Sequence, residues 1–266
     1  MSKSASSFLD RHYFLLRRLH SLSGVAPIGL FLFPHLTTNS SIVWGRFLGH
    51  GDGHDGAAAG VATFQHEVNF IHDLPALKII EFTALFFPIL FHSVLGVWFA
   101  TSGKSNTMRY AYQDNWRYSL QRATGYVGIV FLFMHIMSLR FGLEFGGLMP
   151  TFDPDYASSS TAEHFQKTGG FLLAAFYAIG VLSLVFHFAN GLWTAAITWG
   201  LTVSVSAQRR WGYVCAAIGV ALAGAGLTAI LGFATLDQDL ARSVEQTILG
   251  EEVAADANAD LAASLP

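Results

Sequence analysis

Four histidines lie within long apolar stretches of this chain, where a polar ring that lacks a partner is unfavourable. A neutral imidazole is the commonest metal ligand among protein side chains. For one isolated histidine, a hydrogen bond between two helices would be a sufficient explanation. Because each of the four occupies a different apolar stretch, we expect the rings to act together as metal ligands. They are His35, His92, His135 and His187.

Local sequence repeats sort these histidines into related positions. The segment 31–35, Phe-Leu-Phe-Pro-His, recurs at 131–135 as Phe-Leu-Phe-Met-His. His92 and His187 each follow a phenylalanine, and each precedes a glycine by four residues and a tryptophan by six. The repeats predict two kinds of histidine environment, each present twice.

The elements that position these histidines are predicted to be transmembrane helices. The chain is 52% apolar and 12% charged, whereas soluble domains carry about 25% charged residues. A helix of about 20 residues crosses the hydrocarbon core, and five stretches without Asp, Glu, Lys or Arg are long enough. We therefore predict an all-α membrane protein with five transmembrane helices in an up-down bundle. The expected helices span 22–43, 77–100, 120–141, 169–198 and 211–233.

The distribution of basic residues predicts the orientation of the bundle. Positively charged residues gather in the cytoplasmic loops of membrane proteins. Ten of the fifteen Lys and Arg residues would lie on the side of the N-terminus, so we expect that terminus in the cytoplasm. The ten are Lys3, Arg11, Arg17, Arg18, Lys104, Arg109, Arg117, Arg122, Arg209 and Arg210.

Depth along the helices predicts which histidines face each other. At 1.5 Å per residue, His35 and His135 lie roughly 20 Å from the cytoplasmic start of helices that run outward. His92 and His187 lie a similar distance along helices that run inward. Alternate helices should therefore supply an outer pair, His35 with His135, and an inner pair, His92 with His187.

Two histidine pairs within a bundle are typical of bis-histidine haem sites. The flat porphyrin needs small residues beside it, so that it can approach the backbone. Gly96 and Gly191 follow their histidines by four residues and share their helical face. Gly24 and Gly128 precede His35 and His135 and are expected on the same faces as those histidines. We therefore expect a b-type haem in each of two slots between the helices.

Other chemistries are limited by composition. A single cysteine, Cys215, allows neither an intrachain disulfide nor a cysteine-ligated iron–sulfur cluster. The near-neutral balance of 15 basic and 18 acidic residues gives no field that would attract nucleic acid. A transporter with histidines along its path for zinc or copper remains an alternative, although such paths usually add acidic or cysteine ligands.

Several motifs resemble one family, the dihaem cytochrome b membrane subunit of succinate:quinone oxidoreductases, of the single-subunit, five-helix type. The resemblance covers about residues 13 to 233 and is carried by four segments. They are Arg17-Arg18-Leu19-His20-Ser21, Asn115-Trp116 to Gln121-Arg122, Phe186-His187-Phe188-Ala189-Asn190-Gly191-Leu192-Trp193, and Thr198-Trp199-Gly200.

The resemblance implies that this chain is the membrane anchor and quinone-reactive subunit of a succinate dehydrogenase or fumarate reductase, and that it lies in the cytoplasmic membrane. His92 and His187 would hold the haem near a cytoplasmic iron–sulfur subunit, and His35 and His135 the distal haem. Succinate would be oxidised in a separate flavoprotein subunit. This chain should hold neither FAD nor an iron–sulfur cluster, since it has one cysteine and no dinucleotide-binding glycine motif. The expected acceptor is a quinone, in this family menaquinone.

Further residues are candidates for quinone and propionate chemistry. Glu81 lies near the outer end of the second helix, where a partly desolvated carboxyl could move the proton that accompanies quinone chemistry. Pairing with Lys78, one turn away, is the structural alternative. Donors at the cytoplasmic ends of helices one and three could bind haem propionates. These donors are His20, Ser21, Trp116 and Arg122.

The sequence predicts a division of the chain into a five-helix dihaem domain over residues 1–234 and an acidic, alanine-rich tail over residues 235–266. The tail is expected to be a surface helix or disordered on the outer side. The alternative function is a cytochrome b subunit of another quinone-linked enzyme, such as a formate dehydrogenase or hydrogenase. Those subunits usually have four main helices and different histidine placement.

Overall fold

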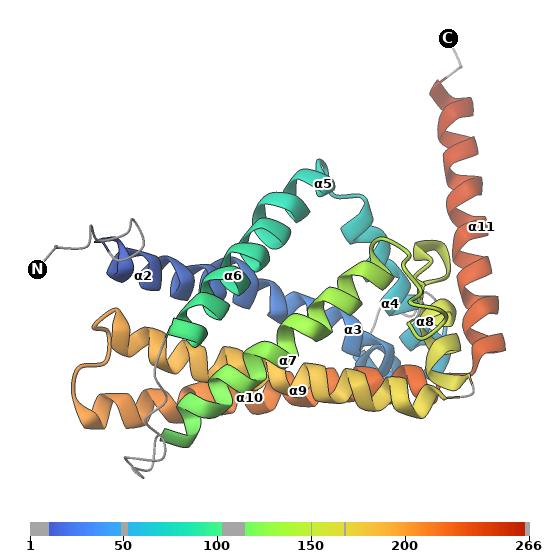
Figure 1. The fold of residues 1–266 in the computed structure, drawn as a ribbon. Coiled ribbons are helices and arrows are strands. Elements are labelled where there is room, and N and C mark those ends of the chain that lie inside the picture. Colours follow the sequence, from blue (N-terminus) through green and yellow to red (C-terminus); the bar gives the residue numbers. More distant parts are fainter. Residues whose placement is uncertain (1–10, 49–52, 103–114, 150, 168, 264–266) are drawn as a thin grey trace, which may run out of the picture. The chain divides into compact units, whose positions relative to one another are not determined.

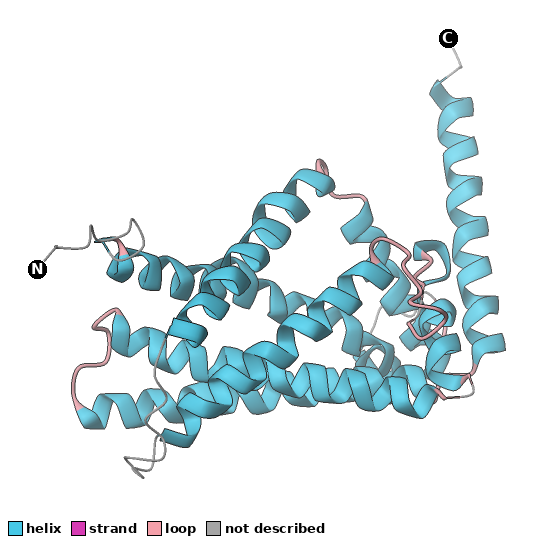
Figure 2. Ribbon diagram, in the orientation of Figure 1, coloured by secondary structure: helices cyan, strands magenta, loops and turns pink. Residues whose placement is uncertain are grey.

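The computed structural model describes residues 11–48, 53–102, 115–149, 151–167 and 169–263. All of the regular secondary structure within these ranges is helical, and short loops join the helices (Figures 1 and 2). Three of the ten basic residues that were used to predict the orientation lie outside the described residues; they are Lys3, Lys104 and Arg109.

Within the residues that the structure describes, five helical stretches are long and apolar enough to cross a membrane, as the sequence predicted. Their surfaces are rich in large apolar side chains, such as Leu30, Val130 and Leu182, which are 66%, 57% and 43% exposed. A helix that is apolar on all sides belongs in lipid rather than in water. The stretches are Tyr13–Leu48, Leu77–Ser102, Trp116–Leu139, Gly170–Thr198 and Val205–Ala234.

The first two spans contain π-helical segments. The first consists of α2 (Tyr13–Ser23), the π-helix η1 (Gly24–Gly29) and α3 (Leu30–Leu48). The second consists of α5 (Leu77–Ile80), the π-helix η2 (Glu81–Phe86) and α6 (Phe87–Ser102). Proline is one cause, because Pro27 within η1 has no backbone N–H to donate.

The remaining spans are uninterrupted α-helices. They are α7 (Asn115–Leu139), α9 (Gly170–Thr198) and α10 (Val205–Ala234). The first span begins nine residues earlier than the predicted residue 22, because the helix continues through the polar segment before the apolar run. A helix that extends beyond the membrane needs no apolar surface there. The apolar pattern therefore identified only the part of the helix that is expected within lipid.

The chain forms two compact units, each assembled from several spans. The first unit comprises residues 1–34, 78–130 and 180–223, and the second comprises 35–77, 131–179 and 224–266. Within the first unit, α2 packs against α6, and the π-helices η1 and η2 pack against each other.

The second unit contains a helical cap outside the spans. It consists of α4 (Gly56–His72), the 3-10 turn η3 (Pro154–Tyr156), α8 (Ala157–Gln166) and α11 (Gln238–Ala263), which pack together (Figure 1). The C-terminal tail therefore forms a helix, and its residues Ala241, Val244 and Ile248 are buried. Burial of these apolar side chains explains why the first part of this tail, residues 238–250, packs as a helix.

A buried carboxylate joins α11 to the cap. Glu245 is 1% exposed, and it accepts hydrogen bonds from the backbone N–H of Ser158 (2.7 Å), the N–H of Ser159 (3.0 Å) and the hydroxyl of Ser159 (2.6 Å). The carboxylate thus satisfies free donors at the N-terminus of α8, where the helix dipole favours negative charge. Burial nevertheless raises the pKa of Glu245 above that of an exposed glutamate.

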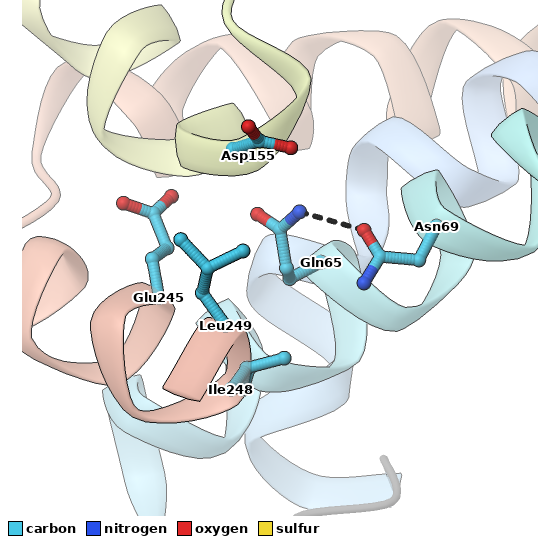
Figure 3. A pocket seen from close by; sticks show the side chains of 6 residues that line it. All are labelled: Gln65, Asn69, Asp155, Glu245, Ile248 and Leu249. Atoms are coloured by element: carbon cyan, nitrogen blue, oxygen red, sulfur yellow. Dashed lines mark hydrogen bonds between the residues drawn. The ribbon is translucent and has the colours of Figure 1, made fainter. Parts of the chain in front are cut away.

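Gln65 provides the second polar link within the cap, beside Glu245 (Figure 3). Its amide nitrogen donates to Asn69 Oδ1 (2.8 Å) and to the carbonyl of Pro154 (2.6 Å), while its oxygen accepts from the N–H of Ala157 (3.2 Å). Gln65 is 2% exposed, so these partners replace the water that it loses on burial. The two side chains fix the start of α8 relative to α4 and α11.

Candidate functional site

The structure brings the four span histidines together as two pairs. His92 on α6 faces His187 on α9, with ring centroids 6.0 Å apart and ring planes at 82°. His35 on α3 faces His135 on α7, with centroids 5.8 Å apart and planes at 81°. Each pair lies within one compact unit, and the partners are those expected from depth along the helices.

The spacing of both pairs fits one metal atom between two imidazoles. A metal–imidazole bond is about 2 Å long, so the two bonded nitrogens lie about 4 Å apart and the ring centroids about 6 Å apart. The measured 6.0 and 5.8 Å match this value. Two rings can share the metal–nitrogen axis at any angle between their planes, so near-perpendicular rings are compatible with a bis-histidine iron.

His92 is oriented by the main chain of the first span. Its Nδ1 lies 2.9 Å from the carbonyl oxygen of His20, which can only accept, so Nδ1 carries the proton and Nε2 has a free lone pair that could bind a metal. The hydroxyl of Ser23 lies 3.4 Å from the same Nδ1 and donates to the same carbonyl at 2.9 Å. A Cβ at Gly24 would collide with the His92 ring, so glycine is required there.

His187 is held in the same way by the third span. Its Nδ1 donates to the carbonyl oxygen of Gln121 at 2.9 Å. In return, Gln121 Nε2 donates to the carbonyl of His187 at 3.1 Å, and Asn190 Nδ2 donates to Gln121 Oε1 at 2.8 Å. A Cβ at Gly125 would lie 3.0 Å from Cε1 of His187, tighter than ordinary contact. The carbonyl again leaves the Nε2 lone pair available to a metal.

His20 also contributes its side chain to this pair. The ring is stacked on His92, with centroids 3.9 Å apart and planes at 14°. Its Nδ1 is buried and has no hydrogen-bond partner within the described residues. An orphaned buried ring nitrogen is unfavourable, and a bound group with a polar substituent would satisfy it.

The His35/His135 pair is surrounded mainly by aromatic side chains. Phe131 is stacked beside His135, with centroids 5.4 Å apart and planes at 18°, and is 4% exposed. Tyr177 on α9 packs edge-on against both rings, and its hydroxyl lies 3.4 Å from His135 Nδ1. Asn39 donates to the carbonyl of His35 at 2.7 Å.

The remaining predicted site residues have other described contacts. Trp116 is 52% exposed, with Phe186 and the guanidinium of Arg117 beside its ring. Arg122 contacts Tyr118, one turn earlier on α7, by a 3.3 Å hydrogen bond and a cation–π interaction. Ser21 is half-buried on α2, and Glu81 is the first residue of η2.

Four glycines were expected on the helical faces of the histidines, and the structure shows which side chains they face. Gly24, expected on the face of His35, lies against the ring of His92. Gly96 faces the ring of His20, Gly128 faces the side chain of Leu184, and Gly191 faces Gln121. The eleven-residue spacing from Gly24 to His35 corresponds to one helical face only in an uninterrupted α-helix, and residues 24–29 are π-helical.

Sequence reasoning missed five residues around the pairs. Tyr177 lies in an apolar run where aromatic side chains are common, so nothing in the sequence distinguished it. Phe131 was seen as part of the repeated segment 131–135 but not as the ring stacked on His135. Gln121 and Asn190 were seen as parts of motifs but not as partners of His187. Gly125 could have been found, because it follows Gln121 at the spacing that separates Gly24 from His20. The residues are Gln121, Gly125, Phe131, Tyr177 and Asn190.

Comparison with known proteins decides the family. The chain is 37% identical over 220 residues to the succinate dehydrogenase cytochrome b558 subunit of Bacillus subtilis, a match that covers 83% of this chain and 96% of that protein. The chain belongs to the succinate dehydrogenase cytochrome b subunit family. No model of a protein family matches the chain, and no solved structure matches it.

Membership in the succinate dehydrogenase cytochrome b family agrees with the predicted resemblance and with the five apolar spans. The protein is a membrane cytochrome b subunit of an electron-transport complex. About one sixth of the chain lies outside the match, since 83% is covered.

Proposed function

We propose that this chain is the membrane anchor and quinone-reactive subunit of a succinate:quinone oxidoreductase, with one b-type haem held by each histidine pair. The observation that carries the proposal is the pair of imidazole spacings, 6.0 and 5.8 Å, which each suit one iron. Family membership supports it, since the Bacillus subtilis relative is a cytochrome subunit of succinate dehydrogenase. A haem held by both imidazoles of a pair would supply one-electron transfer.

The protein's own residues hold the ligands in the required tautomer. Because carbonyl oxygens of His20 and Gln121 accept from the Nδ1–H groups of His92 and His187, each Nε2 is free to ligate. Phe131 and Tyr177 restrict the ring of His135 by packing.

Donors near the His92/His187 pair are proposed to bind the propionates of its haem. His20 presents a buried Nδ1 that has no partner within the described residues. Ser21 lies on the first span, as His20 does, and provides a hydroxyl. Trp116 and Arg122 lie on the third span and provide an indole N–H and a guanidinium. A charge-assisted hydrogen bond to a carboxylate is about twice as strong as a neutral one.

Glu81 is proposed to exchange the proton that accompanies quinone chemistry, with menaquinone as the acceptor. A carboxyl can hold a proton within reach of a quinone oxygen and release it when that oxygen changes charge. Glu81 begins a π-helical segment, and such segments are frequent at functional sites.

We infer that the chain assembles with a flavoprotein subunit, where succinate is oxidised, and an iron–sulfur subunit on the cytoplasmic side. Its single cysteine cannot hold an iron–sulfur cluster. The excess of basic residues on the side of the N-terminus supports the proposed orientation in the cytoplasmic membrane.

Haem content of the purified complex tests this function. The wild type should bind two b haems per chain and co-purify with both soluble subunits. His92→Ala and His187→Ala should each lose the same haem, and His35→Ala and His135→Ala should each lose the other. In each variant the iron would lack one of its two imidazole ligands. His66→Ala, at an exposed position on α4, is the control and should keep both haems.

The absence of haem bands, or loss of the same haem in His35→Ala and His92→Ala, would refute the proposed sites.

The role of Glu81 at the quinone site is tested by Glu81→Gln, which keeps the shape of the side chain but removes its titrating proton. Quinone-linked turnover should fall while succinate oxidation with a soluble dye persists. Equal quinone turnover in Glu81→Gln and the wild type would reject the role of Glu81.

A further inference from the structure

A short sequence motif occurs in both the first and third spans. Leu19-His20 is followed by Ser23-Gly24, and Leu120-Gln121 is followed by Thr124-Gly125 at identical spacing. The pattern is Leu, then His or Gln, two further residues, Ser or Thr, and Gly. We name it the cradle motif.

The cradle motif precedes the repeated Phe-Leu-Phe-x-His segments in both spans. Gly24 lies eleven residues before His35, and Gly125 lies ten residues before His135. The additional residue of the first copy falls where the helix is π-helical, over Gly24–Gly29. A π-bulge is the usual way in which an α-helix accommodates one inserted residue. The distance between the cradle motif and the Phe-Leu-Phe-x-His segment therefore differs by one residue between the two spans, and the π-helical segment accommodates that residue.

Each cradle motif contacts the histidine of the next span along the chain, His92 or His187. The carbonyl of its second residue accepts the Nδ1–H of the ligand, His20 with His92 and Gln121 with His187, and both distances are 2.9 Å. The hydroxyl residue donates to a carbonyl of the same turn, Ser23 to His20 at 2.9 Å and Thr124 to Leu120 at 2.6 Å, with Gln121 at 3.3 Å.

The glycine of the motif gives the ring access to that carbonyl. It lies four residues after the acceptor, on the same helical face. A Cβ at Gly24 would collide with His92, and a Cβ at Gly125 would lie 3.0 Å from Cε1 and 3.3 Å from Nδ1 of His187. A Cβ at Gly24 would therefore displace the ring of His92, whereas a Cβ at Gly125 would press on the ring of His187 and shift it slightly.

The second residue differs between the two copies, and so does its side chain's contact. His20 stacks its ring on His92. Gln121 instead donates to the main-chain carbonyl of His187 and accepts from Asn190, which is 8% exposed. Gln121 thus fixes both the ring and the backbone of its ligand.

We propose that the two cradle motifs are copies of one device that sets the ring orientation of the haem ligands His92 and His187, with Gln121 and Gly125 as positioning residues. This inference rests on the proposed function, because it takes those histidines as ligands. The ring angle of 82° would follow from the two carbonyls, each of which fixes one plane.

The low-field electron paramagnetic resonance signal of the ferric haem tests the proposal, since its position depends on the angle between the two imidazole planes. Gly125→Ala should retain both haems but shift the signal of the His92/His187 haem alone. Gln121→Leu should weaken binding of that haem by about 10–100-fold, as loss of outer-shell partners does. The second haem in the same protein is the internal reference.

Thr194→Val is the matched control, because Thr194 donates to a carbonyl of its own helix, that of Gly191, at 3.0 Å. It should shift neither signal. If Gln121→Leu fails to assemble, Gln121→Glu keeps an acceptor for Asn190 and replaces the amide donor to the carbonyl of His187 by a carboxyl oxygen; it should shift the same signal. Unchanged signals in Gly125→Ala and Gln121→Glu, or shifts in the signal of the other haem, would overturn the inference.

The proposed function fails by a different result. A wild-type chain without two haem signals would refute the haem sites themselves. Two wild-type signals that do not respond to the variants would retain the proposed function and reject only the cradle.

Discussion

The two histidine pairs have nearly the same spacing, 6.0 and 5.8 Å, but they are held by different groups. Backbone carbonyls orient His92 and His187, and glycines give the rings access to those carbonyls. Aromatic packing surrounds His135, with one long hydrogen bond to a tyrosine hydroxyl. The first arrangement depends on empty volume beside the ring, whereas the second depends on filled volume. Added atoms should therefore damage one pair, and removed atoms the other.

The largest effect is expected from adding one methyl group beside His92. In Gly24→Ala the new Cβ would overlap the His92 ring, and close-packed interiors do not absorb such an overlap without moving the ring. We expect loss of the His92/His187 haem and retention of the other, measured as haem per chain in the reduced-minus-oxidised spectrum.

Gly224→Ala is the control for Gly24→Ala, since a Cβ at Gly224 would meet nothing within 4 Å. It should keep both haems. Retention of two haems with unchanged bands in Gly24→Ala would mean that the ring of His92 does not need the space beside Gly24, and the proposed contrast between the pairs would not hold.

The second effect is expected from removing the ring stacked on His135. Phe131 is 4% exposed, and truncating a buried phenylalanine costs about 3–5 kcal/mol where the site cannot collapse. In Phe131→Ala the His35/His135 haem should be released at a lower temperature than in the wild type, while the other haem is unaffected. Haem absorbance during heating is the measurement.

Phe133 offers a matched comparison for Phe131, two residues further along the same helix. Because Phe133 is 56% exposed, Phe133→Ala should lower the release temperature much less. Equal effects of the two variants would indicate that Phe131 contributes only general apolar surface.

The contrast between the pairs also separates what the sequence could and could not predict. The two histidine pairs and the five spans were predictable, because charge-free stretches and repeated motifs are properties of the sequence itself. The carbonyl acceptors were not, since every residue has a carbonyl and only packing selects one. The contact between Gly24 and His92 was not predictable either, because a π-helical segment interrupts the α-helical spacing from which the face of Gly24 was inferred. Burial of Glu245 depends on Ser158 and Ser159, which are distant in sequence.

A third, smaller effect concerns the cap of the second unit. Glu245→Ala would leave two N–H groups of α8 without their acceptor, at a cost of about 1–3 kcal/mol for each buried group that stays unpaired. Phe165 of α8 packs against Tyr177, with ring centroids 5.3 Å apart. We therefore expect faster hydrogen exchange in α8 and α11. Any spectral change should be limited to the His35/His135 haem.

The pH dependence of this cap has a defined sign. Burial raises the pKa of Glu245, so the folded cap binds a proton more readily than the unfolded one. The stability of the cap should increase as pH falls through the raised pKa toward the exposed value, about 4.3. Exchange protection of α11, corrected for intrinsic rates, should show this rise in the wild type. Glu245→Gln should remove it; an identical rise in both proteins would assign the dependence to another group.

The smallest effect is expected from the tyrosine hydroxyl beside His135. The Nδ1 of His135 lies 3.4 Å from the hydroxyl of Tyr177. If Nε2 held a haem iron, Nδ1–H would donate to that hydroxyl, which would make the imidazole a slightly stronger electron donor and favour the ferric state. Tyr177→Phe keeps the packed ring and removes the acceptor, so the midpoint potential of the His35/His135 haem should rise. One hydrogen bond contributes about 1 kcal/mol, which corresponds to a shift of roughly 40 mV in the midpoint potential of a one-electron couple. Because this hydrogen bond is long, at 3.4 Å, the expected shift is smaller than that value. A redox titration that follows both haems checks the value, with the His92/His187 haem as reference. A fall in potential, or an equal shift of both haems, would mean that Tyr177 does not accept from His135.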